Sequence, residues 1–326
     1  MKPYSKIDKL IGEYIDNCLI NNYQDVLSTD ERLEVASYLS DIANGLLGWY
    51  PFEKDGNILQ IGSWFGAFTE MLSFKCQKIT IVENDSYRAD KTKKRLKDIE
   101  NVEVLQKDLL DYCKSCSHTF DYIIFAVDEN IEKIPDSISY LKIIKAIKSI
   151  LNEKGKLLLA VSNRLGVKYF CGVPDPDTAI RFDGITENNS GFYRFSREEL
   201  LNLIKSLGFS NVKLYYPMPD HHHTQVIYTD EMRPRVDVLE RLHVYATHKT
   251  HRLLDEWILM KQLAQNSVLH CFTNSFLVEA GNTPCSSVIY SALSAERDRD
   301  RAFATNIYDN QTVEKIPLYP DGRAGL

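Results

Sequence analysis

Short apolar runs alternate with amphipathic stretches through the middle of the chain. Continuous apolar runs are typical of parallel strands that are buried on both faces, and apolar residues at helical spacing between them predict crossover helices. The alternation therefore predicts an α/β fold with a doubly wound sheet. The runs that predict its first five strands are residues 58–61, 79–82, 102–106, 120–126 and 156–161.

Helical spacing precedes these runs. Apolar residues recur over 5–21 and again over about 30–47, where Ser28 and Glu31 have the spacing of a capping box. After the fifth strand, a second capping box, Ser196 to Glu199, opens a helix that stops at Gly208.

Strand and helix patterns continue toward the C-terminus. We expect strands at 212–216 and 225–229, helical structure over 234–265, and short β runs at 275–279, 288–290 and 312–316. The predicted division is an N-terminal helical segment at 1–50, a central α/β domain at 51–231 and a helical and β extension at 232–326.

The turn after the first strand carries candidate chemistry. Gly62 and Gly66 bracket it, and Glu83 follows about 20 residues later at the end of the second strand. Glycine lets the backbone approach a ligand at a helix start, and an acidic residue at the next strand tip suits a ribose diol. This pattern predicts an adenosine-containing cofactor. A dinucleotide fits less well, because the three-glycine spacing is missing.

Composition narrows the class of protein. The 326 residues carry a net charge of −6, which argues against a broad nucleic-acid-binding face. No apolar run reaches about 18 residues, and no signal-peptide core opens the chain, so we expect a cytoplasmic protein without a membrane span. The seven cysteines are scattered, and Cys113 and Cys116 are interpreted as free thiols rather than half of a zinc site.

The segment 57–83 resembles the first motif of class I S-adenosylmethionine-dependent methyltransferases, with Gln60 and Trp64 at positions where that motif usually has an acidic residue and a glycine. The resemblance implies a seven-stranded Rossmann-like sheet in the order 3-2-1-4-5-7-6 and S-adenosyl-L-methionine as cofactor. It implies that Glu83 binds the ribose and that Asp108 and Leu109 hold the adenine. The full set of expected cofactor-binding residues is Gln60, Gly62, Ser63, Trp64, Gly66, Glu83, Asn84, Asp108, Leu109 and Ala126.

The acceptor should lie beyond the carboxyl ends of the strands. A long loop follows the fifth strand there, and Asn163, Arg164, Lys168 and Tyr169 are the predicted substrate-binding residues. A surface excursion with solvated charges is the alternative.

Two residues near the same edge are candidates for proton removal. They are Asp128, at the tip of the fourth strand, and His221, the first of three adjacent histidines. We expect no metal site, because consecutive histidines rarely converge on one ion.

Further segments, including NRLGVKYFCG and YYPMPD, resemble a bacterial subgroup of methyltransferases found in surface-polysaccharide assembly. The resemblance implies O-methylation, less so N-methylation, of a small or saccharide-linked acceptor, and further domains beyond residue 326. Two alternatives stay open. One is a non-catalytic binding or scaffold domain with the same fold, and the other is an RNA methyltransferase, against which the acidic balance counts.

Overall fold

The computed structural model describes residues 6–18, 22–128, 134–175, 178–186, 193–236, 253–295 and 297–322. Its strands form one sheet of 11 strands in the order β11-β10-β9-β7-β6-β8-β5-β4-β1-β2-β3. The strands are β1 (Asn57–Ile61), β2 (Lys78–Glu83), β3 (Val102–Gln106), β4 (Phe120–Ala126), β5 (Leu151–Ser162), β6 (Asn211–Met218), β7 (Val226–Thr229), β8 (Ser275–Gly281), β9 (Val288–Leu293), β10 (Phe303–Tyr308) and β11 (Val313–Pro317).

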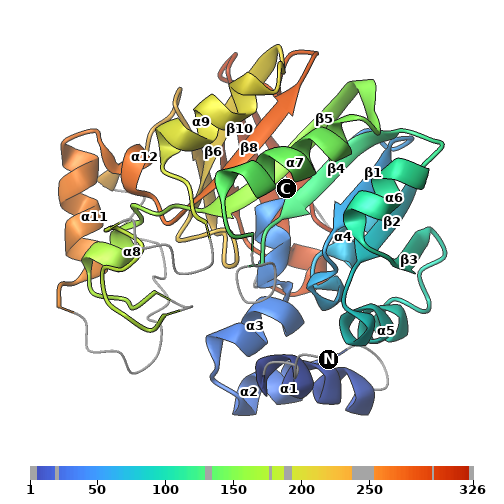
Figure 1. The fold of residues 1–326 in the computed structure, drawn as a ribbon. Helices are drawn as coiled ribbons and strands as arrows, with labels where there is room; N and C mark the ends of the chain where they lie inside the picture. The colour runs from blue at the N-terminus through green and yellow to red at the C-terminus, as the bar shows by residue number, and fades with distance from the viewer. Residues whose placement is uncertain are drawn as a thin grey trace.

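Helices cover both faces of this sheet. In Figure 1, α7 and α9 lie in front of the strands, and α1, α2 and α3 gather below the sheet. The helices are α1 (Lys6–Asn17), α2 (Gln24–Thr29), α3 (Leu33–Leu39), α4 (Thr69–Ser73), α5 (Ser86–Arg95), α6 (Leu109–Ser115), α7 (Ser137–Lys148), α8 (Val167–Phe170), α9 (Arg197–Ser206), α11 (Glu256–Gln265) and α12 (Leu269–Phe272), with 3-10 helices η1 (Asp41–Leu46), η2 (Trp64–Gly66) and η3 (Arg299–Arg301).

Two buried clusters form the core, one on each face of the sheet. One cluster joins the strands to α6, α7 and α9, and the other joins them to α1, α3, α4 and η1. The central strands contribute to both because successive side chains point to opposite faces: Leu59 belongs to one cluster and Ile58 to the other. This explains why the central strands have continuous apolar sequences.

The parallel half of the sheet confirms the α/β prediction. β3, β2, β1, β4 and β5 run parallel in that order, as the first five strands of a Rossmann-like methyltransferase fold do. Beyond β5 the expectation of seven strands is wrong, because the sheet has 11. The antiparallel strand inserted between β5 and β6 is β8, not the segment 225–229. That segment is β7, which pairs with the outer side of β6.

The C-terminal strands extend this same sheet. β9 pairs with β7, and β10 and β11 follow it as antiparallel neighbours. The β character expected beyond residue 275 is therefore present, and β10 is an additional strand. The domain limits at residues 50 and 231 stay predictions. Within the described residues, no helix is long and apolar enough to cross a membrane.

The N-terminal helices differ from the expected pair. A single helix over 30–47 is wrong, because the chain forms α2, α3 and η1 instead. The capping box at Ser28 and Glu31 is wrong too, since Ser28 lies inside α2 and donates its hydroxyl to the Asp25 carbonyl at 2.9 Å. The box at Ser196 and Glu199 is confirmed, and it opens α9. Of the helical pattern at 234–265, residues 237–252 lie outside the described part.

Candidate functional site

A strained turn connects β1 to α4. Gly62, Trp64, Phe65 and Gly66 all have positive φ, at 75°, 48°, 50° and 79°. Glycine adopts this region readily, but Trp64 and Phe65 do so at a cost of order 1–3 kcal/mol each. A Cβ on Gly66 would lie 3.2 Å from the Leu96 side chain. Strain of this kind is kept at sites where the surrounding structure holds the backbone in place.

A hydrogen bond from Trp64 connects this turn to the end of β4. Its indole is buried, and Nε1 donates to the Ala126 carbonyl oxygen at 2.8 Å. The ring stacks on His222, with centroids 4.8 Å apart, and packs against Phe68. Trp64 and Ala126, both predicted to lie at the cofactor, are therefore in direct contact.

Gln60 and Glu83 form hydrogen bonds with the backbone of the same turn. The Glu83 carboxylate accepts the backbone N–H of Ser63 at 2.8 Å and that of Asp85 at 3.0 Å. Gln60 donates to the carbonyls of Gly62 and Ser63 and accepts from the Thr69 hydroxyl. Seven of the residues predicted from the motif thus meet at one place: Gln60, Gly62, Ser63, Trp64, Gly66, Glu83 and Ala126.

The remaining predicted cofactor residues lie at the ends of β2 and β3. Asn84 is exposed after β2, and Asp108 is exposed after β3, where it caps α6 by accepting the Asp111 N–H at 3.1 Å. Leu109 is half-buried beside it. A carboxylate and an apolar side chain are therefore next to each other at the start of α6, just after β3, the strand that neighbours β2.

A buried ionic centre lies next to this turn, and we call it the Arg88 centre: Arg88, Asp8, Asp128 and Tyr38. Arg88 of α5 binds Asp8 of α1 at 2.6 Å and Asp128 at 3.2 Å. Tyr38 of α3 donates to Asp128 at 2.6 Å, and the guanidinium lies 4.6 Å from the Phe65 ring centre. Asp128 is buried, so this predicted catalytic carboxylate is engaged in internal bonds.

Arg88 is a cation in this setting. Burial by itself would lower the pKa of Arg88, but Tyr38, Asp128 and Asp8 raise it above its ordinary value. Arg88 is therefore part of the protein interior, although it lies in a helix of mostly charged residues. Arg88 could not be identified from the sequence, because it lies among lysines and aspartates and nothing in the spacing of charges distinguishes it from its exposed neighbours.

The three histidines form a turn between β6 and β7, and two of them are fixed by hydrogen bonds. His221 lies between the Ser275 hydroxyl, 2.7 Å from Nδ1, and the Val127 carbonyl, 3.2 Å from Nε2. His223 Nε2 lies 2.8 Å from the Ser37 hydroxyl. Since a carbonyl only accepts, His221 carries its proton on Nε2 and holds β4, β6 and β8 together.

His222 is the exception in this turn. It is half-buried against Trp64, and its ring nitrogens have no hydrogen-bond partner among the residues that the structure describes. Burial and the neighbouring His221 lower the pKa of His222 to about 3, so the imidazole is neutral at physiological pH. A neutral imidazole offers one nitrogen donor and one acceptor. The sequence suggested His221 as the histidine for proton removal. In the structure the ring of His221 is hydrogen-bonded, and the ring of His222 is the one that stays available.

Asp220 holds the turn in this form. Its carboxylate accepts the backbone N–H groups of His222 and His223, both at 2.9 Å. Burial would raise the pKa of Asp220, but His223 lowers it well below its ordinary range. An ionised carboxylate thus orients the histidine turn. No group of three His, Cys, Asp or Glu residues in the described parts of the chain has the arrangement of a metal site.

The four predicted substrate-binding residues lie together after β5, but in different roles. Asn163 is buried and donates to the carbonyls of Cys271 and Thr273. Arg164 binds Glu199 at 2.8 Å. Tyr169 is buried, and the Lys168 ammonium lies 5.1 Å from its ring centre. Asn163 therefore joins β5 to the segment before β8, while Arg164 and Lys168 are both half-buried.

Parallel strands in the order 3-2-1-4-5, with the turn after β1 and the Glu83 carboxylate at the end of β2, define the class of fold as that of S-adenosylmethionine-dependent methyltransferases. A family model described as nodulation protein S (NodS) matches residues 52–170, which is less than half of the chain. The match runs from just before β1 to the end of α8, so it contains the turn, Glu83, Asp108 and Asp128. It supports the class of enzyme and the cofactor expected from the sequence.

Solved structures of similar fold include a SAM-dependent methyltransferase from Archaeoglobus fulgidus, 12% identical, covering 71% of this chain and 87% of that one with a TM-score of 0.44. N-methyltransferase NodS from Bradyrhizobium japonicum is 13% identical, with 75% and 93% covered and a TM-score of 0.40. A putative methyltransferase from Streptococcus mutans, in complex with SAH, is 14% identical, with 74% and 95% covered and a TM-score of 0.39. No curated protein matches the chain.

Proposed function

We propose that the chain transfers a methyl group from S-adenosylmethionine to a small polar acceptor. The observation that carries the proposal is the strained turn between Gly62 and Gly66, with the Glu83 carboxylate hydrogen-bonded to the Ser63 N–H inside it. A turn of this geometry brings backbone close to a ligand, and a carboxylate at the neighbouring strand tip suits a ribose diol.

The residues at the strand ends fit such a cofactor. Glu83 would hold the ribose, while Asp108 with Leu109 offers an acceptor and an apolar surface for the adenine. Glu83 now accepts two backbone N–H groups, so ribose binding exchanges or shares those bonds. When bound, the cofactor supplies a methyl group already activated on a sulfonium, so the protein's task is mainly positioning.

His222 is our choice for the residue that orients the acceptor. It is stacked on Trp64, next to the β4 tip, and its neutral ring can accept an N–H or O–H. An imidazole with a pKa of about 3 is a weak base, whereas His221 and Asp128 are engaged elsewhere. A neutral amine needs only orientation, so this observation favours nitrogen over the oxygen that the sequence resemblance suggested.

Calorimetry with the intact chain tests cofactor binding. We expect S-adenosylmethionine and S-adenosylhomocysteine both to bind, and Glu83→Gln to weaken binding by at least about tenfold, which is about 1.4 kcal/mol. Glu103→Gln on the exposed side of β3 is the matched control and should bind as the wild type does. Absence of heat for either ligand would contradict the proposal and favour the scaffold alternative.

Methyl transfer from labelled cofactor tests the acceptor. Amino sugars and their hydroxyl-only counterparts should be compared side by side, with ribosomal and transfer RNA as further acceptors. We expect His222→Ala to raise KM for the acceptor, and His118→Ala, an exposed histidine between α6 and β4, to leave it unchanged. Incorporation into RNA alone would contradict a small acceptor. Localisation in the cytoplasm and a role in polysaccharide assembly belong to the same proposal, and transfer to saccharide-linked acceptors tests the second.

A further inference from the structure

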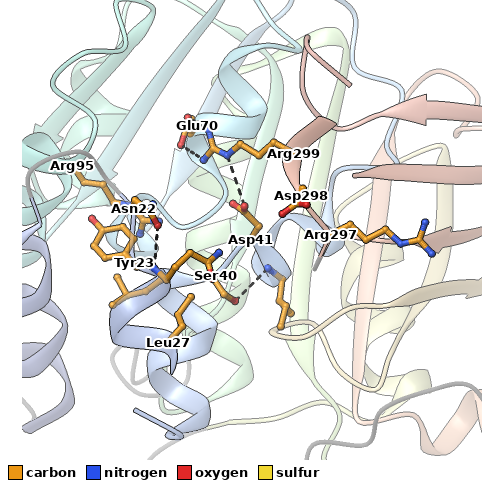
Figure 2. Close-up of a pocket in the computed structure, with 14 residues that line it drawn as sticks. Asn22, Tyr23, Leu27, Ser40, Asp41, Glu70, Arg95, Arg297, Asp298 and Arg299 are labelled. Atoms are coloured by element: carbon orange, nitrogen blue, oxygen red, sulfur yellow. Dashed lines mark hydrogen bonds and ion pairs between the residues drawn. The ribbon is translucent and has the colours of Figure 1, made fainter. Parts of the chain in front are cut away.

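A polar cavity of about 580 Å³ lies between the N-terminal helices and the C-terminal strands (Figure 2). It is separate from the histidine turn and from the strand tips described above. Its described lining comes from α2 and the two residues before it, the end of α3, η1, α4, α5 and the segment from the end of β9 to η3. It comprises Asn22, Tyr23, Gln24, Leu27, Leu39, Ser40, Asp41, Ile42, Glu70, Arg95, Ala295, Arg297, Asp298 and Arg299.

One wall of the cavity is a preformed ionic and aromatic network. Arg299 binds both oxygens of Glu70, at 2.6 and 2.9 Å, and lies 4.6 Å from the Tyr319 ring centre. Asp41 accepts the Tyr319 hydroxyl at 2.8 Å. Figure 2 shows Glu70, Arg299 and Asp41 directed toward one another across the cavity wall. A ligand would therefore meet side chains that are already held in place.

Arg95 of α5 contributes another part of the cavity lining. Arg95 donates to the Tyr38 carbonyl at 2.6 Å and to the Phe65 carbonyl at 3.2 Å, and it lies over the Tyr23 ring. Tyr38 belongs to the Arg88 centre and Phe65 to the strained turn. The cavity thus shares two backbone segments with the candidate cofactor site without overlapping it.

The charges around the cavity balance. Three arginines, Arg95, Arg297 and Arg299, face three carboxylates, Asp41, Glu70 and Asp298. A site for phosphate would have an excess of guanidinium groups, and one for a polyamine would have an excess of carboxylates. The balanced lining favours a ligand without net charge.

The groups that remain available are polar and planar. The Asp298 carboxylate, the Gln24 amide and the Arg297 guanidinium make no hydrogen bond to other side chains among the described residues, and all three are exposed at the rim. A carboxylate accepts two hydrogen bonds side by side, and an amide both donates and accepts, which suits neighbouring hydroxyl groups. Most of the side chains that line the cavity are polar or charged, so an apolar ligand would leave polar groups unpaired.

We propose that this cavity binds a neutral polyhydroxylated molecule of one or two sugar rings, with Asp298 and Gln24 contacting its hydroxyls. The volume falls in the range of about 300–1,000 Å³ that small-molecule sites occupy. The site is additional to the proposed methyl transfer and does not depend on it.

Ligand-observed NMR and calorimetry with the intact chain, in buffer free of glycerol, test the proposal. The probes are the methyl glycosides of glucose, mannose and galactose, N-acetylglucosamine and maltose, with inorganic phosphate and spermidine as charged comparisons. We expect at least one sugar to bind with a millimolar Kd and neither charged probe to compete. The double variant Gln24→Ala, Asp298→Ala should weaken that binding at least about tenfold.

Asp300→Ala is the matched control, because Asp300 is an exposed acid in η3 that does not line the cavity. It should bind sugar as the wild type does. Sugar binding that persists in the double variant would place the sugar elsewhere, at the acceptor site for example, and overturn the proposal. Binding of no sugar, or of phosphate or spermidine in their place, would overturn it as well. Cofactor binding is measured separately, so failure of one proposal is distinguishable from failure of the other.

Discussion

Two arginines in this molecule each bind two carboxylates from distant parts of the chain, but in opposite surroundings. Arg88 has a side chain only 3% exposed, and its partners Asp8 and Asp128 are 9% and 3% exposed. Arg299 is 46% exposed, and its partner Glu70 is 31% exposed. The chemistry is the same, so burial alone distinguishes the Arg88 centre from the wall of the cavity.

The difference in burial predicts different energetic weights. An exposed ion pair is worth about 0–1 kcal/mol, because water screens it and its long side chains lose entropy. Removal of one partner from a buried pair leaves an uncompensated charge and costs far more. The N-terminal helices should therefore depend strongly on the Arg88 centre for their position, and the contact between α4 and η3 should depend little on Arg299.

The largest effect is expected from Arg88→Leu. The substitution leaves the carboxylates of Asp8 and Asp128 buried without their cation, and we expect a loss of about 3–5 kcal/mol in the free energy of unfolding. Urea denaturation followed by circular dichroism measures it. Arg301→Leu, at an exposed position of η3, should change stability little. A loss below about 1 kcal/mol for Arg88→Leu would remove the contrast between the two arginines.

Tyr38→Phe removes a single hydrogen bond from the same centre. The Tyr38 hydroxyl donates to Asp128 at 2.6 Å, and a hydrogen bond to a charged group contributes about 1.5–3 kcal/mol. We expect a loss in that range by urea denaturation, with the fold retained because the ring still packs against Phe65 and Trp64. Tyr308→Phe is the control. The Tyr308 hydroxyl donates to the exposed Glu314, so its removal should lower the free energy of unfolding less. Equal losses in the two variants would contradict the role given to burial.

The parallel strands were predictable because each carries apolar residues on both faces. Glu83 and the glycines of the turn were predictable for a similar reason, since their spacing follows from one βαβ unit. The burial of Arg88 was not predictable. Arg88 lies in a run of lysines and aspartates that is typical of a surface helix, and its partners Asp8 and Asp128 come from distant parts of the chain.

The order of the outer strands could not be predicted from the sequence either. The strand inserted between β5 and β6 lies some 45 residues after β7 along the chain, since β7 ends at Thr229 and β8 begins at Ser275. Local patterning identifies a strand but not its partner. The histidine turn shows the same limit. Its three histidines look identical in the sequence, and they differ only in their contacts: His221 with Ser275, His223 with Ser37 and His222 with Trp64.

We expect His222 to make the free energy of unfolding depend on pH. Its pKa is about 3 in the folded chain and about 6.5 when unfolded, so the neutral form is favoured by folding. Stability from this group is complete above pH 6.5 and is lost as the pH falls toward 3. His222→Asn should therefore flatten the dependence of the unfolding free energy on pH in this window, by at most about 1.4 kcal/mol per pH unit. His118→Asn should leave the slope as it is, and an unchanged slope in His222→Asn would show that the imidazole is not desolvated.

The smallest effect is expected from Glu70→Gln at the exposed arginine. The substitution removes the charge that Arg299 binds with both nitrogens, but Asp41 lies 3.8 Å from Nε and Tyr319 lies beneath the guanidinium. We expect a loss of about 0.2–1 kcal/mol at low salt. In about 1 M salt, where the screening length falls to about 3 Å, the difference from wild type should nearly vanish. The Arg88→Leu loss should persist in the same salt, because solvent ions do not reach a centre that is buried between α1, α5 and β4. If both losses responded to salt equally, the N-terminal helices would be held no more firmly than the cavity wall.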